Sequence, residues 1–182
     1  FGSIAHRIVA REAVRKSLVL MKNEHKLLPL SKSSRVLVAG KSANNLGHQC
    51  GGFTITWQGV SGNEQIEGGT SIWQGINAML ENAQLSENGE GLDADPQQHD
   101  VAIVVIGEPP YSEGMGDIRD DDKKITEAGS KINGQVKLLE AYGQSIELSK
   151  LYPEDLQTIK NITSKGIPVV TIMISGRPLI VD

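Results

Sequence analysis

The distribution of apolar residues along the chain predicts strands that alternate with helices. Three near-continuous apolar runs, rich in β-branched residues, each end in glycine, at 35–40 (RVLVAG), 101–107 (VAIVVIG) and 169–176 (VVTIMISG). Runs of this kind are typical of strands that are buried on both faces of a parallel sheet. We therefore expect three such strands in the interior of the domain.

Apolar residues at helical spacing lie around these strands. They predict helices at about 70–81 and 154–165, and the second follows Pro153 and ends before Gly166, as helices commonly do. Another helix is expected at about 3–17, with Ser3 as its cap. Strands that alternate with helices imply right-handed crossovers and an α/β fold in which helices flank a mostly parallel sheet.

Two segments do not fit this alternation. The short apolar run 18–21 (LVLM) is compatible with the end of a helix or with a brief strand, because periodicity cannot separate the two over so few residues. The segment 118–142 is polar and longer than an ordinary connection of about 2–6 residues. We interpret it as an inserted loop that could act as a flap.

Composition narrows the possible functions. The 182 residues suit one domain, and the net charge of −4 comes from acidic and basic residues mixed along the chain, which makes nucleic acid an improbable partner. No apolar stretch reaches the ~18 residues of a membrane span. The single cysteine, Cys50, gives no internal disulfide and does not indicate a compartment. Phe1 does not begin a signal peptide and Asp182 closely follows a strand, so we expect a truncated piece of a larger protein.

Chemistry is expected in the loops that follow the strands, because ligands of such sheets bind beyond the carboxyl ends of the strands. The loop after the second strand carries three carboxyl groups, on Glu108, Glu113 and Asp117, with prolines and glycines between them. A carboxyl group that desolvation or a neighbouring carboxylate keeps neutral can protonate a leaving oxygen. The alternative is that these acidic residues are simply solvated, as most acidic loop residues are.

The loop after the first strand, at 44–59, is rich in glycine and carries Phe53 and Trp57. An indole ring at the rim of a site is a natural platform for the apolar face of a sugar. The competing interpretation is that Trp57 packs beneath the loop as a small satellite core. The residues alone do not decide between these two roles.

His48 lies in the same loop and is a candidate metal ligand or general base. The other histidines, His6, His25 and His99, show no metal-ligand spacing with it, so a hydrogen-bonded structural histidine is the favoured interpretation. The chain has no glycine-rich dinucleotide motif, phosphate loop or serine-hydrolase elbow. We expect neither a cofactor nor a metal.

Five segments, taken together, resemble family 3 glycoside hydrolases. They are 13–23 (AVRKSLVLMKN), 27–30 (LLPL), 49–59 (QCGGFTITWQG), 107–117 (GEPPYSEGMGD) and 174–178 (ISGRP). Their order matches that of exo-β-glucanases and β-glucosidases of plant and bacterial type. The resemblance covers nearly the whole chain apart from the insertion. It implies that residues 1–182 form the second, flavodoxin-like α/β sandwich domain of such an enzyme, with 1–34 as a helix and linker from a preceding barrel.

The resemblance also implies roles for individual residues. In this family a (β/α)8 barrel supplies an aspartate nucleophile, and the sandwich domain supplies the acid/base and one aromatic wall. The Tyr-x-Glu match places the acid/base at Glu113, and the Trp-Gln-Gly match places the aromatic wall at Trp57. Phe53, where plant relatives often have a second tryptophan, and Tyr111 are further candidates for substrate binding. The nucleophile matches nothing in this sequence, so residues 1–182 are expected to be inactive alone.

The substrates that the resemblance implies are β-glucan oligosaccharides or β-glucosides, from which glucose is removed at the non-reducing end with retention of configuration. A periplasmic or secreted location is expected on the same ground. One alternative is a catalytically silent sugar-binding or interaction module, in which Glu113 only accepts hydrogen bonds. Another is a hexosaminidase, against which the Tyr-x-Glu context of Glu113 argues.

Overall fold

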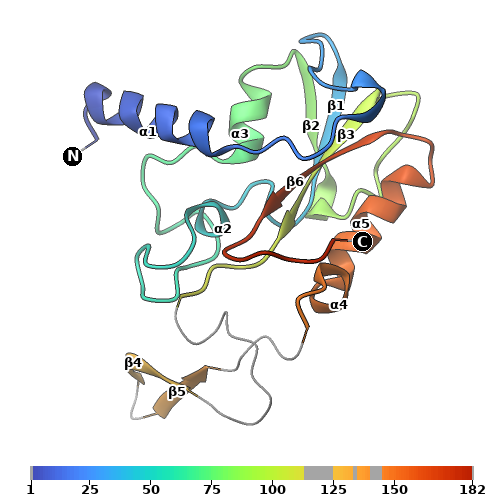
Figure 1. The fold of residues 1–182 in the computed structure, drawn as a ribbon. Helices are drawn as coiled ribbons and strands as arrows, with labels where there is room; N and C mark the ends of the chain where they lie inside the picture. The colour runs from blue at the N-terminus through green and yellow to red at the C-terminus, as the bar shows by residue number, and fades with distance from the viewer. Residues whose placement is uncertain (1, 113–124, 133–134, 140–144, 182) are drawn as a thin grey trace. The chain divides into compact units, whose positions relative to one another are not determined.

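The computed structural model describes residues 2–112, 125–132, 135–139 and 145–181. The chain divides into two compact units, Phe1–Ser31 and Lys32–Asp182. The second unit contains the sheet and the candidate site (Figure 1).

The first unit consists mainly of helix α1 (Ile4–Ser17). The hydroxyl of Ser3 caps this helix by accepting a hydrogen bond from the backbone N–H of His6 at 3.4 Å. The predicted helix and its cap are therefore confirmed. The run 18–21 continues as irregular chain, neither helix nor strand, and is followed by the short 3-10 turn Glu24–Lys26.

The second unit is built on a four-stranded, all-parallel sheet in the order β2-β1-β3-β6. Its strands are β1 (Arg35–Ala39), β2 (Asn82–Leu85), β3 (Val101–Gly107) and β6 (Val169–Ile174). The three apolar strands and the α/β fold class are confirmed. The edge strand β2 was not predicted, because its sequence, NAQL, is half polar and half exposed. The order 2-1-3 is that of flavodoxin-like sheets, in which the switch point for ligands lies between the first and third strands.

The core lies between the sheet and helix α5 (Pro153–Thr163). Ile162 of α5 is fully buried against the alternate residues of β1 and β3 that face the helix, namely Leu37, Ala39, Ala102, Val104 and Ile106. Every residue of β3 is buried, as the continuous apolar run predicted. The edge strand β6 is buried only in part, although its sequence is equally apolar.

Three shorter helices complete the second unit: α2 (Leu46–Cys50), α3 (Ile72–Asn77) and α4 (Leu148–Leu151). Helix α3 confirms the helix predicted at 70–81 but is shorter. It begins at Ser71, whose side chain forms a capping box with Gln74. Helices α2 and α4 were not predicted, because four or five residues are too few to show helical periodicity.

Part of the predicted inserted loop forms an antiparallel pair of strands, β4 (Ile125–Ile132) and β5 (Gln135–Leu139). Residues 118–124, 133–134 and 140–142 of that prediction lie outside the described residues. Backbone hydrogen bonds pair these two strands, and neither is a continuous β-branched run of the kind by which the sheet strands were predicted.

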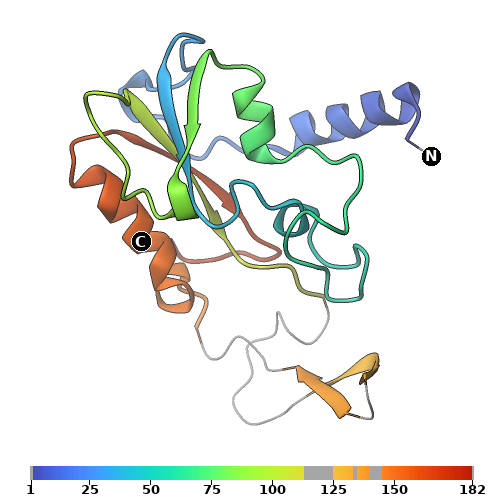
Figure 2. The same cartoon turned by 180° about the vertical axis from the view of Figure 1, so that it is seen from behind.

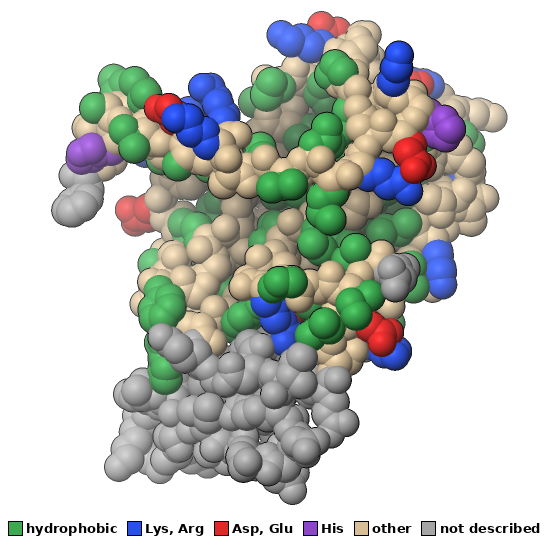
Figure 3. All heavy atoms as spheres, in the orientation of Figure 1, with side chains coloured by type: hydrophobic (Ala, Val, Ile, Leu, Met, Phe, Trp, Pro, Cys, Tyr) green, Lys and Arg blue, Asp and Glu red, His purple; other side chains and the backbone are tan. Residues whose placement is uncertain are grey.

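On the face drawn in Figure 3, basic and acidic side chains are interspersed rather than separated. Within the described part of the chain, no helix combines the length and the apolar character that crossing a membrane requires.

Candidate functional site

The candidate site lies where the neighbouring strands β1 and β3 end. The loop that contains α2 and the loop after β3 leave the same end of the sheet (Figures 1 and 2). A pocket of about 230 Å³ lies between three segments of this rim, 48–52, 108–111 and 174–176. This is the position that the flavodoxin-like strand order favours for a ligand.

Glu108 follows β3 directly and is only 2% exposed. One carboxylate oxygen, Oε1, accepts hydrogen bonds from Nε and Nη2 of Arg177 at 3.0 and 2.8 Å. The other, Oε2, accepts from the Tyr111 hydroxyl at 2.8 Å and from the Ser175 hydroxyl at 3.0 Å. The sequence grouped Glu108 with the rim carboxyl groups, but the structure shows a buried ion pair whose two oxygens both have protein donors. Its geometry is that of a structural carboxylate.

The loop 108–112 is also held from its other side, by the loop that carries Trp57. The side chain of Gln58, which is 6% exposed, accepts a hydrogen bond from the backbone N–H of Ser112 at 2.8 Å. The two loops approach so closely that a Cβ atom added to Gly52 would lie 2.2 Å from the carbonyl oxygen of Tyr111. Glycine at this position therefore lets the two loops pack together.

The two aromatic residues predicted to bind sugar differ in their surroundings. Phe53 is 69% exposed and has a positive φ of 62°. Its backbone N–H donates to the carbonyl of Trp57 at 3.0 Å, which closes a tight turn between them. Trp57 is half-buried. Non-glycine residues with positive φ are strained and tend to occur at functional sites.

Glu113 and Asp117 lie outside the described residues, and Ser112 is the last described residue before Glu113. The structure thus brings Tyr111, Phe53 and Trp57 to one rim and shows the loop that leads to Glu113.

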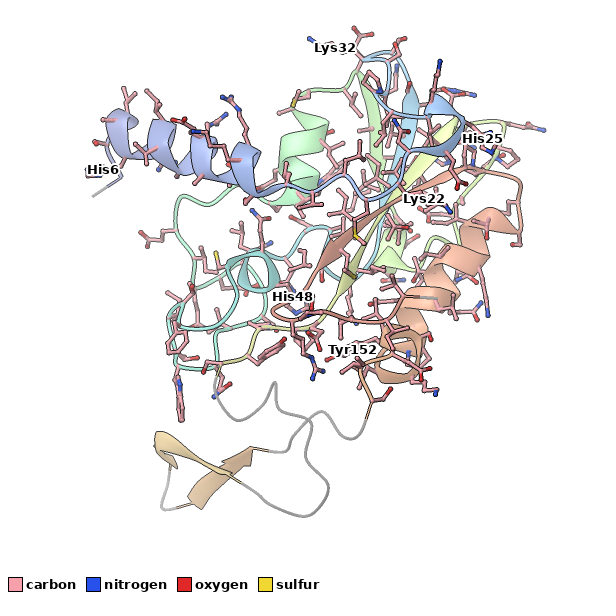
Figure 4. The ribbon with its side chains drawn as sticks, in the orientation of Figure 1. His6, Lys22, His25, Lys32, His48 and Tyr152 are labelled. Carbon is pink, nitrogen blue, oxygen red and sulfur yellow. The ribbon has the colours of Figure 1, made fainter. Side chains whose placement is uncertain are left out.

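His48 points into the rim between two hydroxyl groups (Figure 4). Its Nδ1 lies 2.9 Å from the Ser42 hydroxyl and its Nε2 lies 3.0 Å from the Ser61 hydroxyl. Burial, and then the positive charge of Lys41, lower the pKa of His48 from its usual 6.5. The predicted hydrogen-bonded structural histidine is confirmed. Among the described residues, no group of three or more His, Cys, Asp or Glu side chains is arranged to hold a metal ion.

A second cluster connects the end of β3 to α5. Asp155, at the start of α5, accepts a hydrogen bond from the backbone N–H of Gly107 at 3.0 Å and forms an ion pair of 3.1 Å with Lys41. Lys41 Nζ lies 3.7 Å from the centre of the Tyr152 ring, which Figure 4 labels. Burial raises the pKa of Asp155, although its contacts with Gly107 and Lys41 oppose that shift.

Sequence reasoning gave no roles to Arg177, Ser175 and Gln58. The first two lie in the segment ISGRP, just after the observed strand β6 ends at Ile174, on the same rim as Glu108. One signal was available in the sequence. The apolar run 101–107 is followed directly by Glu108, and the apolar run 169–176 is followed directly by Arg177, so two opposite charges follow two strands of the same predicted sheet. Gln58 gave no signal of this kind, because its partner is a backbone N–H.

Comparison with known proteins places the chain in a defined family. Residues 18–182 match the Glycosyl hydrolase family 3 C-terminal domain. The chain is 25% identical over 197 residues to the lysosomal beta glucosidase of Dictyostelium discoideum, an alignment that covers 98% of this chain and 21% of that protein.

Two solved structures extend this comparison. The exo-1,3/1,4-beta-glucanase of a Pseudoalteromonas species is 38% identical, with a TM-score of 0.76 over 99% of this chain and 19% of that chain. The beta-glucosidase of Listeria innocua, solved in complex with glucose, is 26% identical, with a TM-score of 0.66 over 98% of this chain and 21% of that chain. This chain therefore spans about a fifth of the length of these relatives.

Proposed function

We propose that this chain, which belongs to glycoside hydrolase family 3, is the part of a retaining β-glucosidase or exo-β-glucanase that supplies the acid/base and one aromatic wall of the substrate site. The observation that carries the proposal is the fixed loop 108–112 at the switch point of the sheet. That loop leads directly to Glu113, the glutamate of the Tyr-x-Glu match.

Glu113 is the proposed acid/base. In the first step it protonates the departing glycosidic oxygen, and in the second it takes a proton from the water that hydrolyses the glycosyl-enzyme. A general acid of this kind contributes about 10²–10⁴-fold to the rate. Trp57 is the proposed aromatic wall, and its place on a loop bonded to Ser112 through Gln58 supports that role. Tyr111 and Phe53 are proposed to border the same substrate.

The nucleophile is proposed to come from a part of the full-length protein outside residues 1–182. Retaining glycosidases place their two carboxyl groups about 5–5.5 Å apart across the scissile bond. The described carboxyl group closest in sequence to Glu113 is that of Glu108, and Arg177, Tyr111 and Ser175 already bind it. Residues 1–182 alone should therefore not turn over a β-glucoside.

The proposed substrates are β-glucosides and β-glucan oligosaccharides that are cleaved from the non-reducing end. The support is that the Pseudoalteromonas and Listeria relatives are an exo-glucanase and a β-glucosidase. A periplasmic or secreted location is proposed as well, on the family resemblance alone.

The test is a leaving-group series in the full-length protein. Glu113→Ala should reduce kcat/KM, which reports the first step, by about 10²–10⁴-fold for a cellobiose-type substrate and much less for an aryl glucoside with an acidic phenol, because such a phenol needs little protonation. Asp117→Ala, in the same loop, is the control and should not show this dependence. Near wild-type hydrolysis of cellobiose by Glu113→Ala would favour the silent sugar-binding module instead.

A further inference from the structure

We propose that Glu108 is a positioning residue, whose buried ion pair with Arg177 and hydrogen bond from Tyr111 fix the loop that presents the acid/base. The inference rests on the proposed role of Glu113. It assigns Glu108 a role in the same reaction as Glu113. Glu108 would act by holding the backbone of the loop, and not by contacting the substrate.

The first step of the argument concerns how Glu108 is held. It follows β3, and its backbone N–H donates to the carbonyl of Ile174 in the neighbouring strand β6 at 3.0 Å. Arg177, three residues after Ile174, forms an ion pair with the Glu108 carboxylate. The side chains of this pair are 1% exposed for Glu108 and 12% exposed for Arg177. Ionic hydrogen bonds that are shielded from water are stronger and more directional than exposed ones. The carboxylate of Glu108 is therefore a fixed point at the end of the sheet.

The second step concerns how Glu108 holds Tyr111, three residues further along the loop. The hydroxyl of Tyr111 donates to Glu108 Oε2 at 2.8 Å. The loop after β6 also approaches this hydroxyl, since a Cβ atom added to Gly176 would lie 2.8 Å from its oxygen. The guanidinium of Arg177 lies 5.9 Å from the ring centre. The Tyr111 side chain is thus confined between the loop after β6 and the carboxylate.

The third step concerns the residue that precedes the acid/base. The backbone N–H of Ser112 is bound by Gln58 at 2.8 Å. The chain therefore enters Glu113 from a segment fixed at Tyr111 by Glu108 and at Ser112 by Gln58. Two attachments at consecutive residues fix the described backbone that leads to the acid/base.

Such restriction affects chemistry more than binding. A general acid must come within about 2.6–3.2 Å of the oxygen that it protonates. A displacement of about 1 Å can cost about 10²-fold in rate. If Glu108 fixes the loop, loosening it should reduce protonation of the leaving group and leave the contacts that hold the sugar unchanged.

The experiment uses the full-length protein with Tyr111→Phe, which removes one hydroxyl, and Glu108→Gln, which removes the charge. Each should lower kcat by about 10- to 100-fold for a poor leaving group. For an acidic phenol, each should lower kcat/KM, which reports the first step, much less. KM for the poor leaving group should stay within about twofold, because Phe in place of Tyr111 keeps the ring that is proposed to border the substrate. The alkaline limb of the pH profile, which reports the proton on the acid, should shift in both variants.

Asp100→Asn is the matched control. It weakens another arginine–carboxylate pair, since Arg35 Nε donates to Asp100 Oδ1 at 3.1 Å, and it lies at the start rather than the end of β1 and β3. It should lower the thermal midpoint without any dependence on the leaving group. If Tyr111→Phe and Glu108→Gln behaved like this control, or raised only KM, the positioning role would be overturned.

Glu113→Ala measured in parallel separates the two proposals. If Glu113→Ala shows the leaving-group dependence and the Tyr111 and Glu108 variants do not, the positioning role fails and the proposed function stands. If Glu113→Ala itself lacks the dependence, the proposed function fails and the positioning role fails with it.

Discussion

Gln58 and Ser112 connect the two loops of the site through one hydrogen bond. The side-chain oxygen of Gln58 accepts from the backbone N–H of Ser112 at 2.8 Å. Since Trp57 precedes Gln58 and Glu113 follows Ser112, the proposed aromatic wall and the proposed acid/base are each one residue from this bond.

Gln58→Ala tests this connection. It leaves the part-buried Ser112 N–H without its Gln58 partner, and a donor left unsatisfied on burial costs about 1–3 kcal/mol. We expect the free energy of unfolding, measured by urea denaturation, to fall by that amount. Gln49→Ala is the control, because Gln49 is exposed and its change should stay within about 0.5 kcal/mol. Equal losses in the two variants would contradict the connection.

Gly107→Ala should be far more disruptive than most glycine substitutions. Gly107 has a φ of 134°, and an added Cβ atom would lie 1.8 Å from the carbonyl oxygen of Ile174 in β6. We expect loss of the folded state or a greatly reduced urea midpoint.

Gly75→Ala provides the comparison, since it lies in helix α3 with nothing within 4 Å of its added Cβ. Alanine is favoured over glycine in helices by about 1 kcal/mol, so this variant should be neutral or more stable. A well-folded Gly107→Ala protein would show that the register between β3 and β6 is wrong.

The sequence predicted the strands whose residues are buried on both faces of the sheet, because such strands have continuous apolar sequences. The segment VAIVVIG became β3, whose residues are all buried, whereas NAQL became β2 without any apolar signal. The candidate site was predicted less completely. Glu108 and Arg177 are 69 positions apart, and only the pairing of β3 with β6 brings them together. No local pattern could therefore distinguish the buried glutamate of this loop from an exposed one.

His48 should make stability depend on pH. Burial lowers its pKa below 6.5 in the folded protein, so the unfolded chain binds the proton more tightly. The free energy of unfolding should therefore be greatest above about pH 6.5 and decrease as the pH falls from there toward the folded pKa. Urea midpoints measured between about pH 5 and pH 8 check this.

His48→Gln should remove that part of the pH dependence, while His6→Gln, on the exposed first helix, should not. The same slope in wild type and in His48→Gln would assign the dependence to another group.

Trp57→Ala tests the aromatic wall in the full-length protein. Stacking on a sugar stabilises the ground state and the transition state alike, so its loss should raise KM for oligosaccharides and change kcat little. Phe53→Ala, on the same turn, should have a smaller effect, because Phe53 is 69% exposed. Steady-state kinetics with a series of oligosaccharide lengths measures both. A loss confined to kcat would contradict the assignment of Trp57.

Azide rescue of Glu113→Ala is the most direct test of the central claim. Without a general base, the glycosyl-enzyme formed from an activated aryl glucoside should accumulate, because water attacks it slowly. Azide needs no base, so it should restore turnover and give a β-glucosyl azide, identifiable by NMR. We predict this product from Glu113→Ala and not from Glu108→Gln. Rescue at Glu108 instead, or no azide product from Glu113→Ala, would show that Glu113 is not the acid/base.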